Sequence, residues 1–205
     1  YQRDERLKHQ MFYKAIVFFP LVGAIAAGLF SLRKLDGAAV TVSIAGVCLS
    51  FILSCFAFGT IALGGEQATI DVARWIGSGS FQAHWTLRFD TLTAVMLIVV
   101  TGVSSCVHIY SVGYMHNDKS IARFMAYLSL FTFAMLMLVT ADNLVQLFFG
   151  WEGVGVASYL LIGFWHHKET AHTAAMKAFV VNRVGDFGFV LGLSLIHISE
   201  PTRQP

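Results

Sequence analysis

The sequence predicts an all-α membrane protein with about six transmembrane helices and a surface β-hairpin between helices 2 and 3. Of the 205 residues, 56% are hydrophobic and only 13% are charged, and the mean hydropathy is +0.66. This composition is typical of a chain that crosses a membrane several times. Apolar stretches of spanning length alternate with short polar connections, and one longer connection has the pattern of a strand pair. A scattered net charge of +2 does not favour nucleic acid as a partner.

The chain divides into residues 11–112, with three predicted spans, and residues 113–192, with three more. Residues 1–10 are polar and charged, and we expect them to be an upstream or disordered segment before a true start at Met11. Residues 193–205 change abruptly to polar sequence and end in proline. Because they resemble a translated sequencing adapter, we expect a non-native tail that cuts the sixth helix short.

The predicted spans follow one another in chain order. They cover residues 13–32, 38–63, 91–112, 121–140, 142–165 and 173–193. Almost no connection separates the fourth span from the fifth. We therefore expect these two helices to form a tight antiparallel pair.

The connection between the second and third spans, residues 64–90, has the pattern of a β-hairpin. Polar residues in its second half alternate strictly with Phe81, Ala83, Trp85, Leu87 and Phe89. A period of two is typical of a half-buried strand. A weaker alternation precedes it, and the glycines and serines of residues 77–80 supply a turn. We expect the hairpin to lie on the membrane surface, with Trp75 and Trp85 at the interface.

The positive charges of the short connections predict the orientation. The first, third and fifth connections carry Arg33, Lys34, Lys119, Arg123 and Lys168. Short loops rich in lysine and arginine remain in the cytoplasm. We therefore expect these three connections on the cytoplasmic side and both ends of the six-span unit on the opposite side.

Glu152 is the one charged side chain between Asp142 and Trp165 in the fifth span. A helix rises about 1.5 Å per residue, so the carboxylate lies roughly 15 Å into a hydrocarbon core about 30 Å thick. A charge at this depth is rarely retained without a partner or a function. Two interpretations remain open: a neutral acid that holds helices together, or an acid that exchanges protons or pairs with a cation on a transport path. Small residues beside it allow close helix approach, namely Gly150, Gly153 and Gly155.

The sixth span carries a heavy polar load for a membrane helix: Lys177, Asn182, Arg183 and Asp186. Arg183 and Asp186 are three residues apart and can therefore meet on one helix face. One interpretation is a structural ion pair between them, with Lys177 extending toward the cytoplasmic interface. The other is that all three take part in transport, because ionisable groups inside a membrane are commonly functional.

Neither the eight histidines nor the three cysteines favour a metal or haem centre. Cys48 and Cys55 are about 10 Å apart on one predicted helix, which is too far for a disulfide. His108 and His116 bracket the end of the third span, and no histidine is placed deep in a span as a haem would require. The sequence also has no dinucleotide-binding fingerprint. We therefore expect no cofactor in this chain.

Three stretches resemble the antiporter-like L subunit of proton-pumping NADH:quinone oxidoreductase, respiratory complex I: RFDTLTAVMLIVVTGVSSCVHIYSVGYM, ADNLVQLFFGWEGVGVASYLLIGFW and AAMKAFVVNRVGDFGFVLG. The resemblance covers about residues 11–192. Its GWEGVG and NRVGD segments are specific to this subunit and to related multi-subunit cation/proton antiporters. It implies that residues 113–192 are the first part of an antiporter-like proton-translocating domain, at the start of the first inverted repeat.

The resemblance also implies roles for the polar residues. Glu152 matches the family's membrane glutamate of the fifth helix, and Lys177, Arg183 and Asp186 match polar residues of the sixth. In the family the glutamate pairs with a lysine on a broken seventh helix, which this sequence does not contain. A nearby lysine stabilises the ionised acid, and its withdrawal favours proton uptake.

The expected function is proton translocation by a membrane subunit of complex I, coupled to electron transfer from NADH to quinone elsewhere in the complex. The expected partners are the lipid bilayer and other membrane subunits, especially the neighbouring antiporter-like subunit. The expected location is a bacterial inner (plasma) membrane rather than a mitochondrial inner membrane. Two alternatives remain: a subunit of a multi-subunit Na⁺/H⁺ antiporter, and a purely structural membrane subunit.

Overall fold

A computed structural model describes residues 2–65, 67–78 and 81–199. Six helices in this part of the chain are long and apolar enough to cross a membrane, which confirms the predicted all-α class and the number of spans. The helices are α1 (Gln2–Leu32), α2 (Asp36–Phe58), α3 (Thr91–Tyr114), α4 (Ile121–Val139), α5 (Leu144–Ile162) and α6 (Glu169–Ser199). The chain is therefore a multi-pass membrane protein.

The first and last helices are longer than the predicted spans. Helix α1 begins at Gln2, so residues 2–10 extend the first helix and are not a disordered segment. Most of them are good helix formers, namely arginine, glutamine, glutamate, leucine and lysine. Helix α6 continues to Ser199, so the prediction that the tail cuts this helix short is wrong. Residues 193–199 contain no proline or glycine to end the helix, and residues 200–205 lie outside the described part.

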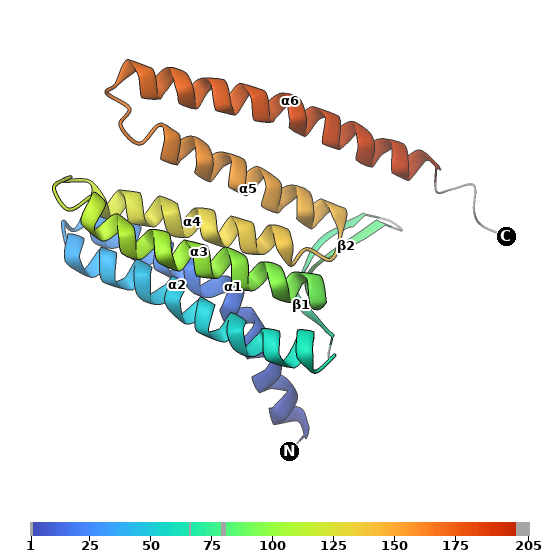
Figure 1. The fold of residues 1–205 in the computed structure, drawn as a ribbon. Coiled ribbons are helices and arrows are strands. Elements are labelled where there is room, and N and C mark those ends of the chain that lie inside the picture. The colour runs from blue at the N-terminus through green and yellow to red at the C-terminus, as the bar shows by residue number, and fades with distance from the viewer. Residues whose placement is uncertain (1, 66, 79–80, 200–205) are drawn as a thin grey trace.

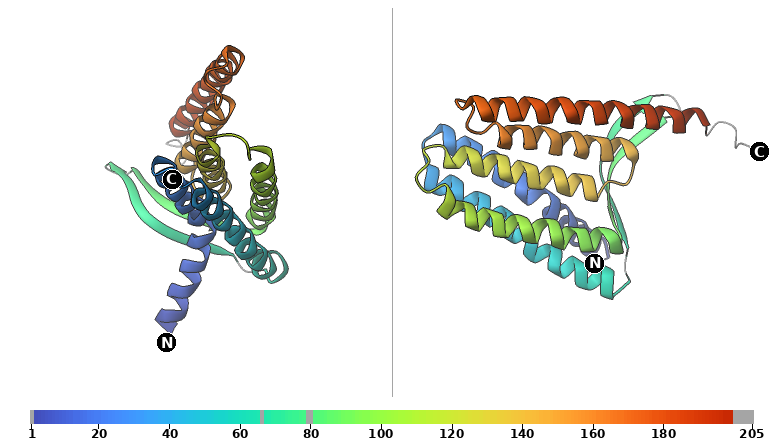
Figure 2. Two further views of the ribbon diagram at one scale, coloured as in Figure 1. Left: turned by 90° about the vertical axis from the view of Figure 1, so that its left-hand side faces the viewer. Right: turned by 45° about the horizontal axis from the view of Figure 1, so that its top comes forward.

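Helices α1 to α4 form a bundle, and α5 and α6 extend it as two further layers (Figures 1 and 2). Helix α5 packs on α4, and α6 packs on α5. At Gly150 the α4 and α5 backbones approach so closely that a Cβ atom would be 2.7 Å from Cα of Leu138. This is the tight pair that was predicted, although residues 140–143 form a short connection between the two helices.

A side chain of α2 compensates for the proline inside α1. Pro20 has no N–H, so the carbonyl of Ile16, one turn earlier, loses its helical donor. The hydroxyl of Ser50 donates to that carbonyl at 2.5 Å, and both residues are fully buried. An unpaired backbone carbonyl is costly in a membrane, so this bond favours one register of α1 against α2.

The hairpin predicted between the second and third spans is present. After a π-helical segment, η1 (Gly59–Leu63), strand β1 (Ala68–Ser78) pairs antiparallel with β2 (Phe81–Phe89). Gly77 and Ser78 are paired strand residues, so the connection between the strands is shorter than predicted. Leu87 and Phe89 are buried, as the alternation predicts, but the polar Thr86 between them and Trp85 is buried as well. The side chains of residues 81–83 lie outside the described ones.

The hairpin covers one end of the helical bundle (Figure 1). Leu87 and Phe89 join Tyr13 of α1 and Leu97 of α3 in the main apolar core. Trp75 and Trp85, which we expected at the interface, pack against each other and against a phenylalanine of α5, Phe149. The three connections that carry the short-loop positive charges lie at the opposite end of the bundle. Their cytoplasmic location remains a prediction.

Polar bonds to the hairpin fix the start of α5. Asn143 caps this helix, because its Oδ1 accepts from the backbone N–H of Gln146 at 2.9 Å. The Nδ2 of Asn143 donates to the carbonyl of His84 at 2.8 Å, and the N–H of Thr86 donates to Oε1 of Gln146 at 3.1 Å. Because the first turn of α5 is held by β2, the hairpin sets the position of the helix that carries Glu152.

Candidate functional site

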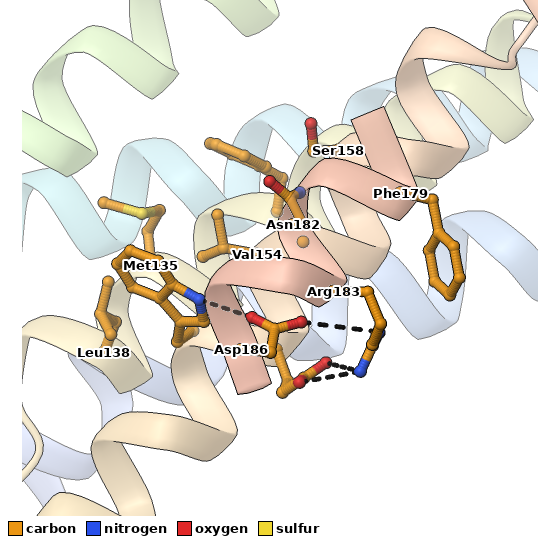
Figure 3. Close-up of a pocket in the computed structure, with 12 residues that line it drawn as sticks. Met135, Leu138, Val154, Ser158, Phe179, Asn182, Arg183 and Asp186 are labelled. Carbon is orange, nitrogen blue, oxygen red and sulfur yellow. Dashed lines mark hydrogen bonds and ion pairs between the residues drawn. The ribbon is translucent and has the colours of Figure 1, made fainter. Parts of the chain in front are cut away.

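Polar side chains of α5 and α6 meet near the middle of the helices, around Glu152 (Figure 3). Glu152 is eight residues beyond Leu144, about 12 Å along the 19-residue helix α5, so it lies near its centre as expected. The glycines around it face two neighbours. Gly153 faces Ala134 of α4, where a Cβ atom would be 3.1 Å from the alanine Cβ, and Gly155 faces Asn182 of α6.

Arg183 on α6 contacts both acidic residues of the site. Its Nη1 lies 2.8 Å from Oε2 and 2.9 Å from Oε1 of Glu152. Its Nε lies 3.5 Å from Oδ2 of Asp186. The spacing of Arg183 and Asp186 along one helix predicts their pairing. The bond to Glu152 was not predicted, because it depends on how α5 and α6 pack.

Asp186 is the most buried member of the cluster. Its side chain is 7% exposed, compared with 22% for Glu152 and 48% for Arg183. Its Oδ1 accepts a hydrogen bond of 2.9 Å from Nε1 of Trp151. The sequence contains a signal for Trp151 that was not used, because an indole N–H inside a membrane span requires an acceptor and this residue directly precedes Glu152.

The charges of the cluster do not balance when both acids are ionised. Two carboxylates, those of Glu152 and Asp186, share the single guanidinium of Arg183, which gives −2 + 1 = −1. An uncompensated buried charge is costly. One proton on either carboxylate, or one further cation brought beside them, makes the cluster neutral. The arrangement therefore suits either the uptake of a single proton or the approach of a cationic partner.

A cavity of about 440 Å³ opens beside the cluster. Its polar lining includes Glu152, Asn182, Arg183 and Asp186, and α4 contributes apolar walls (Figure 3). Apolar walls with a few convergent polar groups are typical of ligand sites. The volume is sufficient for several water molecules. Water in this space would lie beside the carboxylates of Glu152 and Asp186.

Lys177 is not part of the cluster. Its side chain is exposed, and it precedes Arg183 by six residues, or about 9 Å along the helix. It is not among the described residues that line the cavity. It makes no ion pair with any described residue. The structure therefore brings together three of the four predicted site residues, Glu152, Arg183 and Asp186, and leaves Lys177 nearer the connection between α5 and α6.

A second polar network connects α2, α3 and α4. His108 lies near the end of α3, as expected, and its side chain is fully buried between the helices. Its Nδ1 lies 2.8 Å from the Ser104 carbonyl and its Nε2 lies 3.1 Å from Oγ of Ser129, which in turn is 2.6 Å from Oγ of Ser43. These bonds satisfy the imidazole inside the bundle. Among the described residues, no group of three or more histidine, cysteine or acidic side chains is placed to hold a metal ion.

Two family models match the chain. The model described as NADH-Ubiquinone oxidoreductase (complex I), chain 5 N-terminus, matches residues 75–125. The model described as NADH:quinone oxidoreductase/Mrp antiporter, TM, matches residues 141–203, which include the whole Glu152 cluster. Fold, cluster and matches together define an antiporter-type membrane subunit.

Two curated relatives of similar sequence identify the family. NADH-quinone oxidoreductase subunit L of Rickettsia typhi is 52% identical over 93% of this chain and 29% of its own length. NADH-ubiquinone oxidoreductase chain 5 of Arabidopsis thaliana is 55% identical over 88% of this chain and 27% of its own. The chain belongs to this subunit L/chain 5 family of NADH:quinone oxidoreductase. It spans less than a third of the length of these relatives.

A solved structure supports the fold. It is described as the membrane-bound sulfane sulfur reductase, an archaeal respiratory membrane complex, and one of its chains superposes with a TM-score of 0.74 over 94% of this chain and 38% of its own. At 18% sequence identity, this similarity concerns the fold alone.

Proposed function

We propose that this chain takes part in proton translocation as a membrane subunit of NADH:quinone oxidoreductase in an inner membrane. The observation that carries the proposal is the pair of carboxylates that share one guanidinium near the middle of the spans. The names of the relatives support the enzyme complex, and the matched antiporter-type model covers the cluster. NADH oxidation and quinone reduction are proposed to occur in other subunits, which are also the proposed partners, above all the neighbouring antiporter-like subunit.

In the proposed mechanism Glu152 is the acid that exchanges protons. When it is ionised, Arg183 binds both of its oxygens. When it takes up a proton, that attraction weakens, and the guanidinium remains with Asp186, which Trp151 holds in place. A cation that approaches the protonated cluster then favours the ionised form of Glu152, and the proton is released. Lys177 is proposed to aid proton exchange from the end of α6 that carries the predicted cytoplasmic connection.

Two other functions are distinguishable from this one. A subunit of a multi-subunit cation/proton antiporter would use the same cluster, and the description of the second family model includes such antiporters. The other matched model and the named relatives favour complex I. A purely structural subunit would use the cluster only to hold α5 against α6, and would not require an exchangeable proton.

Replacement of Glu152 by glutamine in the full-length protein, within its assembled complex, separates transport from structure. Glutamine keeps the shape and a hydrogen bond, so we expect a packing change below about 1.5 kcal/mol and normal assembly. It cannot release a proton, so proton pumping in membrane vesicles, normalised to assembled complex, should fall strongly. Glu152→Asp should be milder, because the charge is kept.

Glu169→Gln is a matched control, because Glu169 is exposed in the first turn of α6 and makes no bond within the cluster. It should pump like the wild type. Wild-type pumping by Glu152→Gln would overturn the proposal and favour the structural subunit.

A further inference from the structure

A second cavity lies where the first turns of α4 and α6 meet the end of α5. Its volume is about 220 Å³. Its polar lining consists of Arg123, Tyr127, Tyr159, His166 and His172. Each of these side chains can donate a hydrogen bond, and no acidic side chain is among the described residues that line the cavity. The polar lining therefore suits an anion.

Arg123 is held in place through only part of its guanidinium. Its Nη2 donates to the carbonyl of Phe164 at 3.3 Å, and its Cζ lies 4.9 Å from the centre of the Phe164 ring. Its buried Nε has no hydrogen-bond partner among the described residues. A guanidinium has five N–H donors, so Phe164 orients this group while most of its donors stay available to a ligand.

The carboxylate that acts on Arg123 electrostatically is already bonded to other groups. Asp118 accepts from Nε1 of Trp165 at 3.0 Å and from the backbone N–H of Ser120 at 2.8 Å. The bond from Trp165, followed by that from Ser120, holds the pKa of the Asp118 carboxyl below its usual range. Asp118 therefore stays ionised near neutral pH, but it makes no ion pair with Arg123 and does not line the cavity.

The position of the cavity indicates the source of the anion. Its lining residues flank and include part of the connection between α5 and α6. This connection lies at the end of the bundle opposite the hairpin (Figure 1). Nζ of Lys168 lies 4.7 Å from the centre of the Trp165 ring in this connection, and tryptophan and lysine are common at membrane–water interfaces. The short-loop charges predict that this end faces the cytoplasm, and basic pockets between helices on that side bind anionic lipid head groups.

We propose that this cavity binds the phosphate of an anionic phospholipid of the cytoplasmic leaflet, with Arg123 as the principal ligand. His172 and the Tyr159 hydroxyl contribute from α6 and α5, so one headgroup would link three helices. Phosphate accepts several convergent donors, and arginine matches its geometry. This site is separate from the Glu152 cluster and does not depend on proton translocation.

Photoactivatable phosphatidylglycerol, reconstituted with the complex that contains the full-length protein, tests the proposal. We expect covalent labelling of the segment 159–175, and roughly fivefold less labelling in Arg123→Gln, from loss of one arginine near the surface. The exposed Arg33, on the first connection at the same end, supplies the matched control, and Arg33→Gln should label like the wild type. His172→Gln is a second test that leaves the Arg123–Phe164 contact intact, and it should label less.

Two further arms distinguish the source of the phosphate. Photoactivatable phosphatidylcholine should label this segment much less, because it carries no net negative charge. Inorganic phosphate at millimolar concentration should not displace the lipid, and displacement would assign the site to free phosphate instead. Labelling that is unchanged in both Arg123→Gln and His172→Gln, or equal for the two lipids, would overturn the proposal.

Discussion

Arg183 on α6 lies 2.8 and 2.9 Å from the two carboxylate oxygens of Glu152 on α5, while its Nε stays 3.5 Å from Asp186. One guanidinium therefore forms ion pairs with two carboxylates, one on each helix. The same contact joins α6, the outermost helix, to α5. The charge balance of the cluster and the packing of this helix pair are consequently linked.

Removal of the Arg183 guanidinium should change both the charge balance of the cluster and the packing of α6 against α5. Arg183→Gln removes the guanidinium that pairs with Glu152 and Asp186. We therefore expect a loss of about 1.5–3 kcal/mol in stability, together with reduced pumping. The double variant Arg183→Gln/Glu152→Gln should recover assembly, because it removes one of the unpaired charges, but it should not recover pumping. A double-mutant cycle on the amount of assembled complex measures the coupling. Strictly additive losses would contradict the shared ion pair.

Lys177 should affect transport without affecting assembly. It is exposed and makes no ion pair with a described residue, so Lys177→Ala removes no packing contact of the cluster. We expect pumping to fall less than in Glu152→Gln, since water partly screens an exposed cation nearer the end of α6 that is predicted to face the cytoplasm. Pumping in vesicles, normalised to assembled complex, is the measurement. A defect equal to that of Glu152→Gln would instead place Lys177 beside Glu152 in the proton path.

The contact between α4 and α5 makes Gly150 sensitive to substitution. A Cβ atom there would be 2.7 Å from both N and Cα of Leu138, and backbone atoms cannot move aside as a flexible side chain can. We expect Gly150→Ala to cost about 1–3 kcal/mol and to lower the thermal unfolding temperature of the complex. Gly113→Ala is the matched control, because an added Cβ there meets no atom within 4 Å. Equal effects of the two substitutions would refute the close approach.

The orientation is testable by cysteine accessibility in a variant that lacks the native cysteines. Cysteines placed at Ser120 and Thr170 should react with a membrane-impermeant reagent only after the membrane is opened. A cysteine at Gln67, on the hairpin side and exposed, should react in intact cells. Labelling of position 120 or 170 from outside would rule out the predicted orientation.

The sequence alone was sufficient for features that depend on neighbouring residues. Hydropathy located six spans, the period of two located the hairpin, and residue counting placed Glu152 near the centre of α5. The pairing of Arg183 with Asp186 follows from the geometry of one helix. Hydropathy was a poor guide to where α1 begins and to where α6 begins and ends, because it marks where a segment becomes polar and not where its backbone hydrogen bonds stop.

Tertiary structure alone decided which side chains meet across helices. The Arg183–Glu152 pair, the bond from Trp151 to Asp186, the burial of His108 and the cavity beside Arg123 all require two or more helices in a particular register. Each helix has several polar residues on its surface, and the sequence of that helix alone does not determine which of them faces another helix. That choice follows from close packing, such as that of Gly150 against Leu138, and from the need to satisfy every polar group in an apolar medium.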